Sequence, residues 1–289
     1  MSVWIMAARP KTLPAAIAPV IIGTVMAYGD GLFHWLAASA ALFGAVMIQI
    51  GTNFANDYYD YRKGGDHSER LGPTRATHAG LVTPRQMKVA TFIAFGLAFA
   101  AGVYLVYRAG WPVVVIGLTS ILFGVLYTGG PYPLGYHGLG EIFVLIFFGP
   151  IAVGGTYYVQ ALHITIPVIV AGLAPGLFSV AILTVNNLRD IKGDTASGKR
   201  TLVVRFGEAF AKMEYSFSIG IASLLPVLIV FLVHDRPYAV ATIVIPLLAV
   251  PTIRTVFANA DGPSMNSALA GTGRLLLLYT LVFAVGWLL

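Results

Sequence analysis

Long apolar stretches recur along the whole chain and are separated by short polar or glycine- and proline-rich segments. A helix needs about 20 predominantly apolar residues to cross the hydrocarbon core of a bilayer. Nine stretches approach or exceed this length, so we expect an all-α, polytopic membrane protein with nine transmembrane helices in one bundle. The predicted spans are residues 13–28, 33–56, 87–107, 111–127, 140–160, 164–188, 213–233, 238–257 and 273–289.

Composition supports this class. Of the 289 residues, 57% are hydrophobic and only 10% are charged, whereas a soluble domain carries about 25% charged residues. No polar linker interrupts the apolar pattern, which predicts a single transmembrane domain over residues 1–289. The chain has no cysteine, so disulfides and thiolate chemistry are excluded, and its six histidines lack the spacing of zinc ligands.

The basic residues fall almost entirely on one side of the predicted bundle. With the N-terminus placed inside, sixteen of the eighteen Lys and Arg residues lie in inner segments, and Arg108 and Arg236 lie outside. Cytoplasmic segments carry such an excess of basic residues. We therefore predict a multi-pass protein of the cell (inner) membrane with a cytoplasmic N-terminus and cytoplasmic inner loops. The net charge of +6 then reflects topology and the lipid bilayer, not a nucleic-acid partner.

Two segments at the inner ends of predicted spans are rich in Asn and Asp. NFANDYYDYRKGGD covers residues 53–66 and follows the second span, and NNLRDIKGD covers residues 186–194 and follows the sixth. Residues spaced three or four apart share one face of a helix. Such faces are formed by Asn53, Asp57 and Asp60, and by Asn186, Asp190 and Asp194. Their recurrence four spans apart is typical of an internal repeat.

The residue types in these segments suit a divalent cation and an anionic ligand. Mg²⁺ prefers oxygen ligands and usually binds through one or two carboxylates plus substrate phosphates. Basic residues follow each acidic face, namely Arg62 and Lys63 in the first segment, and Lys199 and Arg200 after the second. Arginine and lysine stabilise diphosphate oxygens through charge-assisted hydrogen bonds. The pattern favours a diphosphate site in a central cavity open to the inner side.

Two other interpretations of the acidic and basic segments account for less of the pattern. In the simplest one, the acids are solvated loop residues and the bases only mark topology, but the shared faces and their duplication favour a binding site. In the other, the protein is a transporter or channel that binds divalent cations. That function predicts acids near the middle of the spans, whereas these lie at the inner ends.

An enzyme of isoprenoid transfer accounts for more of the pattern. Mg²⁺ stabilises a leaving diphosphate while a carbocation forms in a dry apolar cavity, and aromatic rings stabilise that cation. The candidate rings by location are Tyr58, Tyr59, Tyr61, Tyr127, Tyr132, Tyr136 and Phe147. The chain lacks a phosphate-binding P-loop and a serine nucleophile elbow.

Five segments carry a resemblance to a known family. They are RPKTLPAAIAPVIIGT (9–24), NFANDYYDYRKGGD (53–66), RLGPTRATHAGLVTP (70–84), YTGGPYPLGYHGLGE (127–141) and NNLRDIKGDTASGKRTLVVRFGE (186–208). In these segments the chain resembles the UbiA-type intramembrane prenyltransferases. The RPKTLPA and RLGP segments are similar to the branch of 1,4-dihydroxy-2-naphthoate polyprenyltransferases of menaquinone synthesis. The last three helices match the family only in hydrophobicity.

The resemblance implies a reaction and a set of site residues. A polyprenyl group would pass from polyprenyl diphosphate to 1,4-dihydroxy-2-naphthoate with release of diphosphate and CO₂, giving demethylmenaquinone. Mg²⁺ and the diphosphate would be held by Asn53, Asp57, Asp60, Asp190 and Asp194. Lys63 would join the catalytic group, and further substrate contacts would come from Arg9, Arg62, Tyr127, Asn186, Asn187, Lys199 and Arg200. Asp66 would either complete the first motif or close the loop over the site.

Related acceptors stay open at this point. The same acidic motifs serve phytyl transfer in phylloquinone synthesis and prenylation of 4-hydroxybenzoate, homogentisate or a glycerol phosphate. Because the motifs bind the diphosphate that all these reactions share, they do not discriminate among the acceptors. The electron-rich naphthoate ring needs no strong base, and none is assigned.

Overall fold

A computed structural model describes residues 2–289 except 64–70, 73–74 and 259–260, and the described residues contain helices and connecting segments but no β-strand. The α-helices are α1 (Val3–Ala8), α2 (Leu13–Gly29), α3 (Trp35–Arg62), α4 (Pro84–Ala109), α5 (Trp111–Leu126), α6 (Gly140–Ile146), α7 (Ala152–Ala161), α8 (Ile166–Arg189), α9 (Ile191–Ala196), α10 (Leu202–Val233), α11 (Ile245–Phe257) and α12 (Gly262–Leu288). Short 3₁₀ helices occupy η1 (Pro10–Thr12), η2 (Leu134–Tyr136) and η4 (Pro237–Val244), and η3 (Phe147–Ile151) is a π-helical turn.

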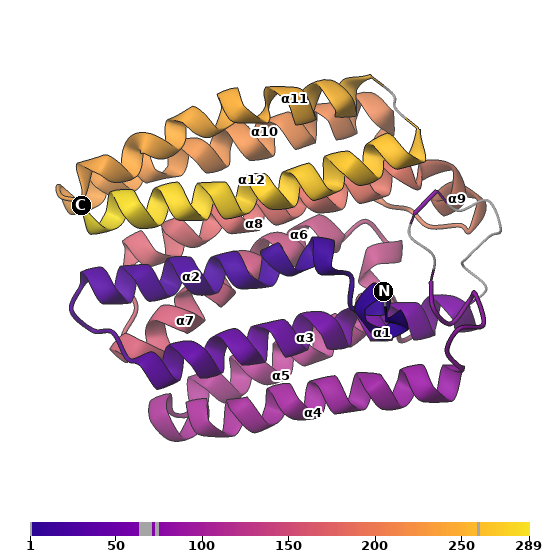
Figure 1. The fold of residues 1–289 in the computed structure, drawn as a ribbon, viewed down its shortest axis with the longest axis horizontal. Coiled ribbons are helices and arrows are strands. Elements are labelled where there is room, and N and C mark those ends of the chain that lie inside the picture. The colour runs from indigo at the N-terminus through magenta and orange to yellow at the C-terminus, as the bar shows by residue number, and fades with distance from the viewer. Residues whose placement is uncertain (1, 64–70, 73–74, 259–260) are drawn as a thin grey trace.

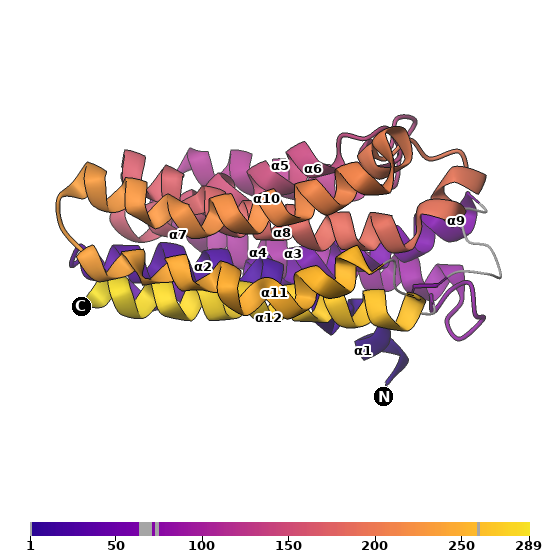
Figure 2. The same ribbon diagram turned by 90° about the horizontal axis from the view of Figure 1, so that it is seen from above.

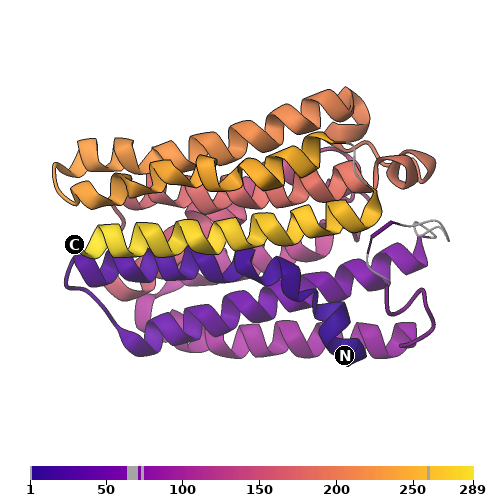
Figure 3. The same cartoon turned by 45° about the horizontal axis from the view of Figure 1, so that its top comes forward.

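The long helices run along a common axis in alternating directions (Figure 1). Figure 3 shows α10 and α11 together along one edge of the bundle and α3 and α4 along the other. Seen from above, α1 projects from the bundle near the N-terminus (Figure 2). The connections at the end where α2 meets α3 are short, and the longer segments that connect helices lie at the other end (Figure 1).

The predicted membrane architecture is confirmed. Within the described residues, eight helical segments are long and apolar enough to cross a membrane, and α5, with 16 residues, is the ninth apolar helix. Large apolar side chains such as Phe92, Tyr107 and Leu247 remain exposed on the outward faces. Contiguous apolar surface of this kind is expected where a protein meets lipid.

Several helices extend further at the inner end than hydropathy predicted. α3 continues to Arg62, α10 begins at Leu202 instead of residue 213, and α12 begins at Gly262 instead of residue 273. These extensions mix charged, polar and glycine residues with apolar ones, so a hydropathy pattern does not register them. Side-chain caps support two of them: Thr201 accepts the amide of Val204 at 3.2 Å, and Asp261 caps the start of α12.

α8 lies at the centre of the bundle and contacts α2, α10, α12 and the broken helix formed by α6, η3 and α7. A Cβ atom at Gly172 would lie 2.7 Å from the Cα of Pro150, and one at Gly176 would lie 2.5 Å from the Leu145 carbonyl oxygen. These small residues therefore allow α8 to pack closely against the broken helix. Next to Pro150 the helix is irregular, because the backbone of Gly149 is non-helical.

Candidate active site

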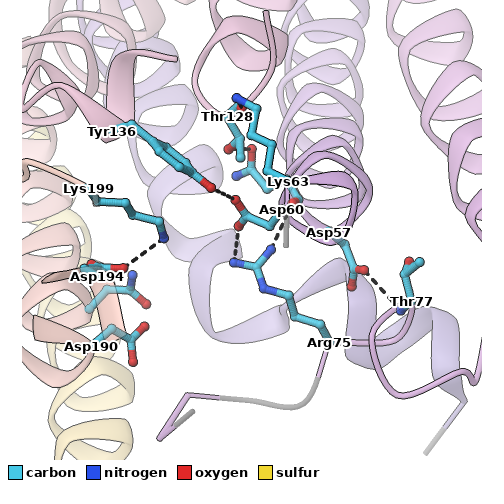
Figure 4. Close-up of polar contacts among 12 residues, drawn as sticks. Asp57, Asp60, Lys63, Arg75, Thr77, Thr128, Tyr136, Asp190, Asp194 and Lys199 are labelled. Carbon is cyan, nitrogen blue, oxygen red and sulfur yellow. Dashed lines mark hydrogen bonds and ion pairs between the residues drawn. The ribbon is translucent and has the colours of Figure 1, made fainter. Parts of the chain in front are cut away.

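The two acidic segments meet at one end of the bundle, because α3 and α8 run in the same direction and both end there (Figure 1). Between the helix ends lies a recess that we call the polar pocket; Figure 4 shows most of its charged side chains. Its lining residues are Arg9, Asn56, Asp60, Arg75, Tyr127, Thr128, Gly135, Tyr136, Asn186, Asn187, Asp190, Asp194, Lys199 and Thr201.

Asp60 is the carboxylate that the first acidic segment directs into the polar pocket (Figure 4). It is 4% exposed, accepts a hydrogen bond from the Tyr136 hydroxyl at 2.6 Å and forms an ion pair with Arg75. Arg75 also donates to the backbone carbonyl of Asn56 at 2.9 Å. The side-chain oxygen of Asn56 accepts the Thr128 hydroxyl at 2.5 Å. Asn56 and Asp60 are four residues apart, so one face of α3 supplies both.

Asn53 and Asp57 do not line the polar pocket. The two carboxylate oxygens of Asp57 accept the backbone N–H groups of Ala76 and Thr77 at 3.0 and 3.1 Å. The side-chain amide of Asn53 donates to the Ala8 carbonyl at 2.9 Å. Successive helical residues turn by about 100° around the axis, so residues at different helical angles contact different neighbours. Both residues hold neighbouring segments against α3.

The second acidic segment lies where the chain changes direction between α8 and α9. Arg189 donates to both carboxylate oxygens of Asp190, at 2.8 and 2.6 Å, and to the side-chain oxygen of Asn186 at 2.7 Å. The Lys199 ammonium donates to Asp194 at 2.8 Å. Because the helix ends inside this segment, both of its carboxylates line the polar pocket.

Asn187 lies next in sequence to Asn186 and also lines the polar pocket. Its side-chain nitrogen donates to a carboxylate oxygen of Glu141 at 3.2 Å, and Glu141 is buried at the start of α6. This hydrogen bond orients the Asn187 amide so that its oxygen is available to the pocket.

Tyr136 joins the two acidic segments. Its hydroxyl donates to Asp60, and the ammonium groups of Lys63 and Lys199 each lie 4.9 Å from the centroid of its ring. Burial raises the pKa of Tyr136, and the charge of Asp60 raises it further, so the phenol stays protonated. Burial lowers the pKa of Lys63, an effect that the Asp60 carboxylate opposes. Lys63 also donates to the Thr128 carbonyl at 2.6 Å.

The other predicted residues are placed differently. Arg9 and Tyr127 line the polar pocket, whereas the side chains of Arg62 and Arg200 are exposed and do not line it. Arg62 reaches the Tyr58 hydroxyl at 3.4 Å, and Arg200 contributes only its backbone N–H, to the Tyr136 carbonyl at 2.8 Å. Asp66 lies outside the described residues.

Sequence reasoning missed several lining residues. They are Asn56, Arg75, Thr128, Gly135 and Thr201. Tyr136 was predicted only as an aromatic ring near the site, and the structure adds its hydrogen bond to Asp60. Asn56 carried a usable signal, because it stands four residues before Asp60 and shares its helical face. Arg75 carried none, because it arrives from a separate turn whose path depends on packing.

The oxygen donors of the polar pocket fit Mg²⁺. Among the described residues no ready cluster of three acidic or histidine side chains forms; Asp60, Asp190 and Asp194 are each paired with a cationic side chain. Mg²⁺ commonly uses one or two protein carboxylates and completes its shell with phosphate and water. Carboxylates from two helix ends, together with side-chain amide oxygens, therefore provide a suitable donor set.

An apolar cavity of about 220 Å³ adjoins the polar pocket and lies among α2, α3, α4, α5 and the broken helix α6–η3–α7. Glycines and alanines line much of it, together with the rings of Phe123, Phe143 and Phe147. Tyr127 lines both spaces, and no other described residue does. A ligand with a charged head and an apolar tail would therefore pass Tyr127 where the two parts join.

The model of the UbiA prenyltransferase family matches residues 16–278. The chain belongs to this family. A UbiA relative from Escherichia coli (strain K12), 1,4-dihydroxy-2-naphthoate octaprenyltransferase, is 39% identical, with 98% of this chain and 94% of the relative covered. A relative with the same name from Mycobacterium tuberculosis (strain ATCC 25618 / H37Rv) is 38% identical, with 97% and 95% covered. Family membership confirms the predicted resemblance and the enzyme class of prenyltransferases.

The UbiA fold is shared with solved structures. A UbiA homolog from Archaeoglobus fulgidus bound to GPP and Mg²⁺ superposes with a TM-score of 0.69 at 16% identity, and 99% of each chain is covered. At this identity the likeness concerns the fold, and it confirms the helical bundle.

Proposed function

We propose that this UbiA-family protein transfers a polyprenyl group from polyprenyl diphosphate to 1,4-dihydroxy-2-naphthoate, releasing diphosphate and CO₂ and giving demethylmenaquinol, the reduced form of demethylmenaquinone. The observation that carries the proposal is the junction at Tyr127 between a pocket of paired acidic and basic side chains and an apolar cavity. The names of the relatives support the naphthoate acceptor.

The polar pocket would hold the diphosphate. Asp60, Asp190 and Asp194, with the Asn56 amide oxygen, would hold Mg²⁺, which when bound neutralises the diphosphate and stabilises it as a leaving group. Arg75 and Lys199 are at present paired with two of these carboxylates. With the metal in place, their donors would turn to phosphate oxygens, because charge-assisted hydrogen bonds to phosphate are strong.

The apolar cavity would hold the isoprenoid chain. Each buried methylene contributes about 0.8 kcal/mol, so a long chain binds mainly through the hydrophobic effect. The chain's reacting carbon, next to the diphosphate, would lie near Tyr127 and the cluster of Phe123, Phe143 and Phe147. Phe123 lies 4.7 Å from Phe143 and 5.4 Å from Phe147, centroid to centroid. These rings exclude water and stabilise positive charge at the allylic carbon.

The reaction balances without an external base or oxidant. The bond between the allylic carbon and the diphosphate oxygen breaks, and its electron pair leaves with the diphosphate. The electron-rich naphthoate ring supplies the pair for the new carbon–carbon bond. Its carboxylate then leaves as CO₂, and the pair from that bond restores the aromatic ring.

The membrane setting supports this assignment. The apolar helices make the protein a multi-pass membrane protein, so both lipid-soluble substrate and product can remain in the bilayer. We place the polar pocket on the cytoplasmic side of the cell membrane, because the basic residues gather at the same end of the bundle.

A transfer assay tests the function. The purified protein in lipid nanodiscs is given Mg²⁺, polyprenyl or phytyl diphosphate, and one of three acceptors: 1,4-dihydroxy-2-naphthoate, 4-hydroxybenzoate or homogentisate. We expect demethylmenaquinol from the naphthoate acceptor and polyprenyl diphosphate, detected as demethylmenaquinone after oxidation of the extract by air. Product only with another acceptor, or only with the phytyl donor, would move the assignment to the corresponding alternative.

The assay needs two matched variants. Asp190→Ala removes a carboxylate from the polar pocket and should lower transfer by about 10³-fold. Asp235→Ala removes an exposed carboxylate that pairs with its neighbour Arg236, and should leave transfer unchanged. No product from well-folded wild type with any acceptor would contradict the proposed function.

A further inference from the structure

Asp57 belongs to the first acidic segment by sequence, but its carboxylate contacts a different part of the chain. It is 2% exposed, and its two oxygens accept the consecutive backbone N–H groups of Ala76 and Thr77 at 3.0 and 3.1 Å. Figure 4 shows the contact with Thr77. Asp57 is absent from the lining of the polar pocket. Its two oxygens therefore serve a backbone segment nearly twenty residues away in sequence.

The segment that Asp57 holds is a compact turn over residues 75–82. Backbone hydrogen bonds close it, from the amide of Ala79 to the Arg75 carbonyl at 3.0 Å and from Leu81 to the Ala76 carbonyl at 3.0 Å. Ala76 is fully buried and belongs to a small apolar cluster with Phe54 of α3. The backbone of the turn is thus held against α3 by the Asp57 carboxylate, and its apolar residues Ala76 and Val82 join the cluster that contains Phe54.

Arg75, at the start of this turn, is the residue that enters the polar pocket. Its side chain is 7% exposed, pairs with Asp60 and donates to the Asn56 carbonyl at 2.9 Å. Asp57 and Asp60 stand three residues apart on α3. One of them holds the backbone of the turn and the other receives the guanidinium that the turn presents.

We propose that Asp57 is a positioning residue: it fixes the 75–77 backbone so that Arg75 reaches the polar pocket, and it does not bind Mg²⁺. This proposal deepens the proposed function, because the group that Arg75 would bind there is the diphosphate. Without the Asp57 carboxylate, the buried amides of Ala76 and Thr77 lose their acceptors. The turn then no longer defines the direction of the Arg75 side chain.

Kinetics of Asp57→Asn, Arg75→Gln and the double variant test the positioning role. The asparagine side chain offers one acceptor oxygen in place of two, so Asp57→Asn should raise the KM for polyprenyl diphosphate about tenfold, as a displaced binding residue does. The Mg²⁺ concentration for half-maximal activity should stay within about twofold of wild type. Asp57→Asn should add little in the Arg75→Gln background, because both changes act through one contact.

A metal-ligand role would give the opposite pattern. Asp60→Asn serves as the comparator and should shift the Mg²⁺ requirement. If Asp57→Asn shifts it equally, or if its effect is fully additive with Arg75→Gln, the proposal is wrong. The milder variant Asp57→Glu, which keeps the charge but lengthens the side chain, should repeat the pattern of raised KM and unchanged Mg²⁺ requirement.

Hydrogen exchange gives a readout that does not depend on activity. In substrate-free protein, Asp57→Asn should speed amide exchange of Ala76 and Thr77 by about tenfold or more, because their acceptor is weakened. Asp190→Asn, from the other acidic segment, is the control and should leave these amides as in wild type. Amide exchange in α8 at the same rate as in wild type shows that each variant is folded.

Unchanged exchange at Ala76 and Thr77 in folded Asp57→Asn would overturn the proposal even if the enzyme is fully active. Faster exchange, together with absence of prenyl transfer in wild type, would support the positioning role and reject only the proposed reaction.

Discussion

The two acidic segments contain the same residue types but present them to the polar pocket by different backbone paths. In the first, α3 continues to Arg62, so both acids lie on one helix and Asp60 faces the pocket while Asp57 faces a separate turn. In the second, the chain changes direction between α8 and α9, so Asp190 and Asp194 both line the pocket. The direction of the backbone decides which carboxylates can act together.

The cations that pair with these carboxylates also come from different places. The second segment pairs locally: Asp190 with Arg189, and Asp194 with Lys199. In the first segment, Asp60 pairs with Arg75, which belongs to the separate turn over residues 75–82. The first half of the site therefore depends on a non-local contact, and the second half is built from one stretch of chain.

Removal of divalent metal should have the largest effect, and it tests whether both segments share one ion site. Treatment with EDTA should reduce transfer to background, and added Mg²⁺ should restore it, because the leaving diphosphate requires charge neutralisation. Asp60→Asn and Asp190→Asn should both raise the Mg²⁺ concentration for half-maximal activity. EDTA-resistant transfer would contradict the metal assignment for both segments.

Alanine substitutions should then separate the carboxylates within the first segment. Asp60→Ala and Asp190→Ala should each lower kcat/KM by about 10³-fold, the scale seen when a charge-stabilising group is removed. Asp57→Ala should act mainly on the KM for the diphosphate. Steady-state kinetics in nanodiscs measure kcat and KM for each variant. Equal losses of kcat in all three variants would show that Asp57 acts like the two carboxylates that line the pocket.

The paired cations should differ in their effect on stability. Arg75 and Asp60 have side-chain exposures of 7% and 5%, so Arg75→Gln leaves a buried charge unpaired, a change that destabilises by about 3–5 kcal/mol. Lys199 is more exposed, at 16%, so Lys199→Gln should lower the thermal midpoint less. Melting curves in detergent without substrate measure the difference, and a larger drop for Lys199→Gln would reverse the comparison.

Of these changes, Tyr136→Phe should have the smallest effect on transfer, and it should act on Asp60 of the first acidic segment. It removes one hydrogen bond to Asp60, which contributes about 1–3 kcal/mol for a charged acceptor, and it keeps the ring beside Lys63 and Lys199. We expect about a tenfold loss in kcat/KM. Tyr136→Leu, which also removes the ring, should lose more. Equal losses in the two variants would show that the ring contributes nothing.

Much of this arrangement was predictable from local sequence. Nine apolar stretches determined the helices, because the hydrophobic requirement of a bilayer acts on each segment separately. The clustering of acids and bases at one end followed from the positions of charged residues relative to the spans. Hydropathy failed where helices extend beyond the apolar stretches, as in the first turns of α10 and α12.

The sequence by itself therefore determined the membrane class, the family and the end of the bundle that carries the chemistry. Only the tertiary structure decided that Asn56, and not Asn53, accompanies Asp60, and that Asp57 holds a turn. It also brought Arg75 and Tyr136 to Asp60 from separate segments. The reason is physical: helix formation follows from neighbouring residues, whereas the contacts of a side chain depend on its angle around the helix and on the segments packed against it.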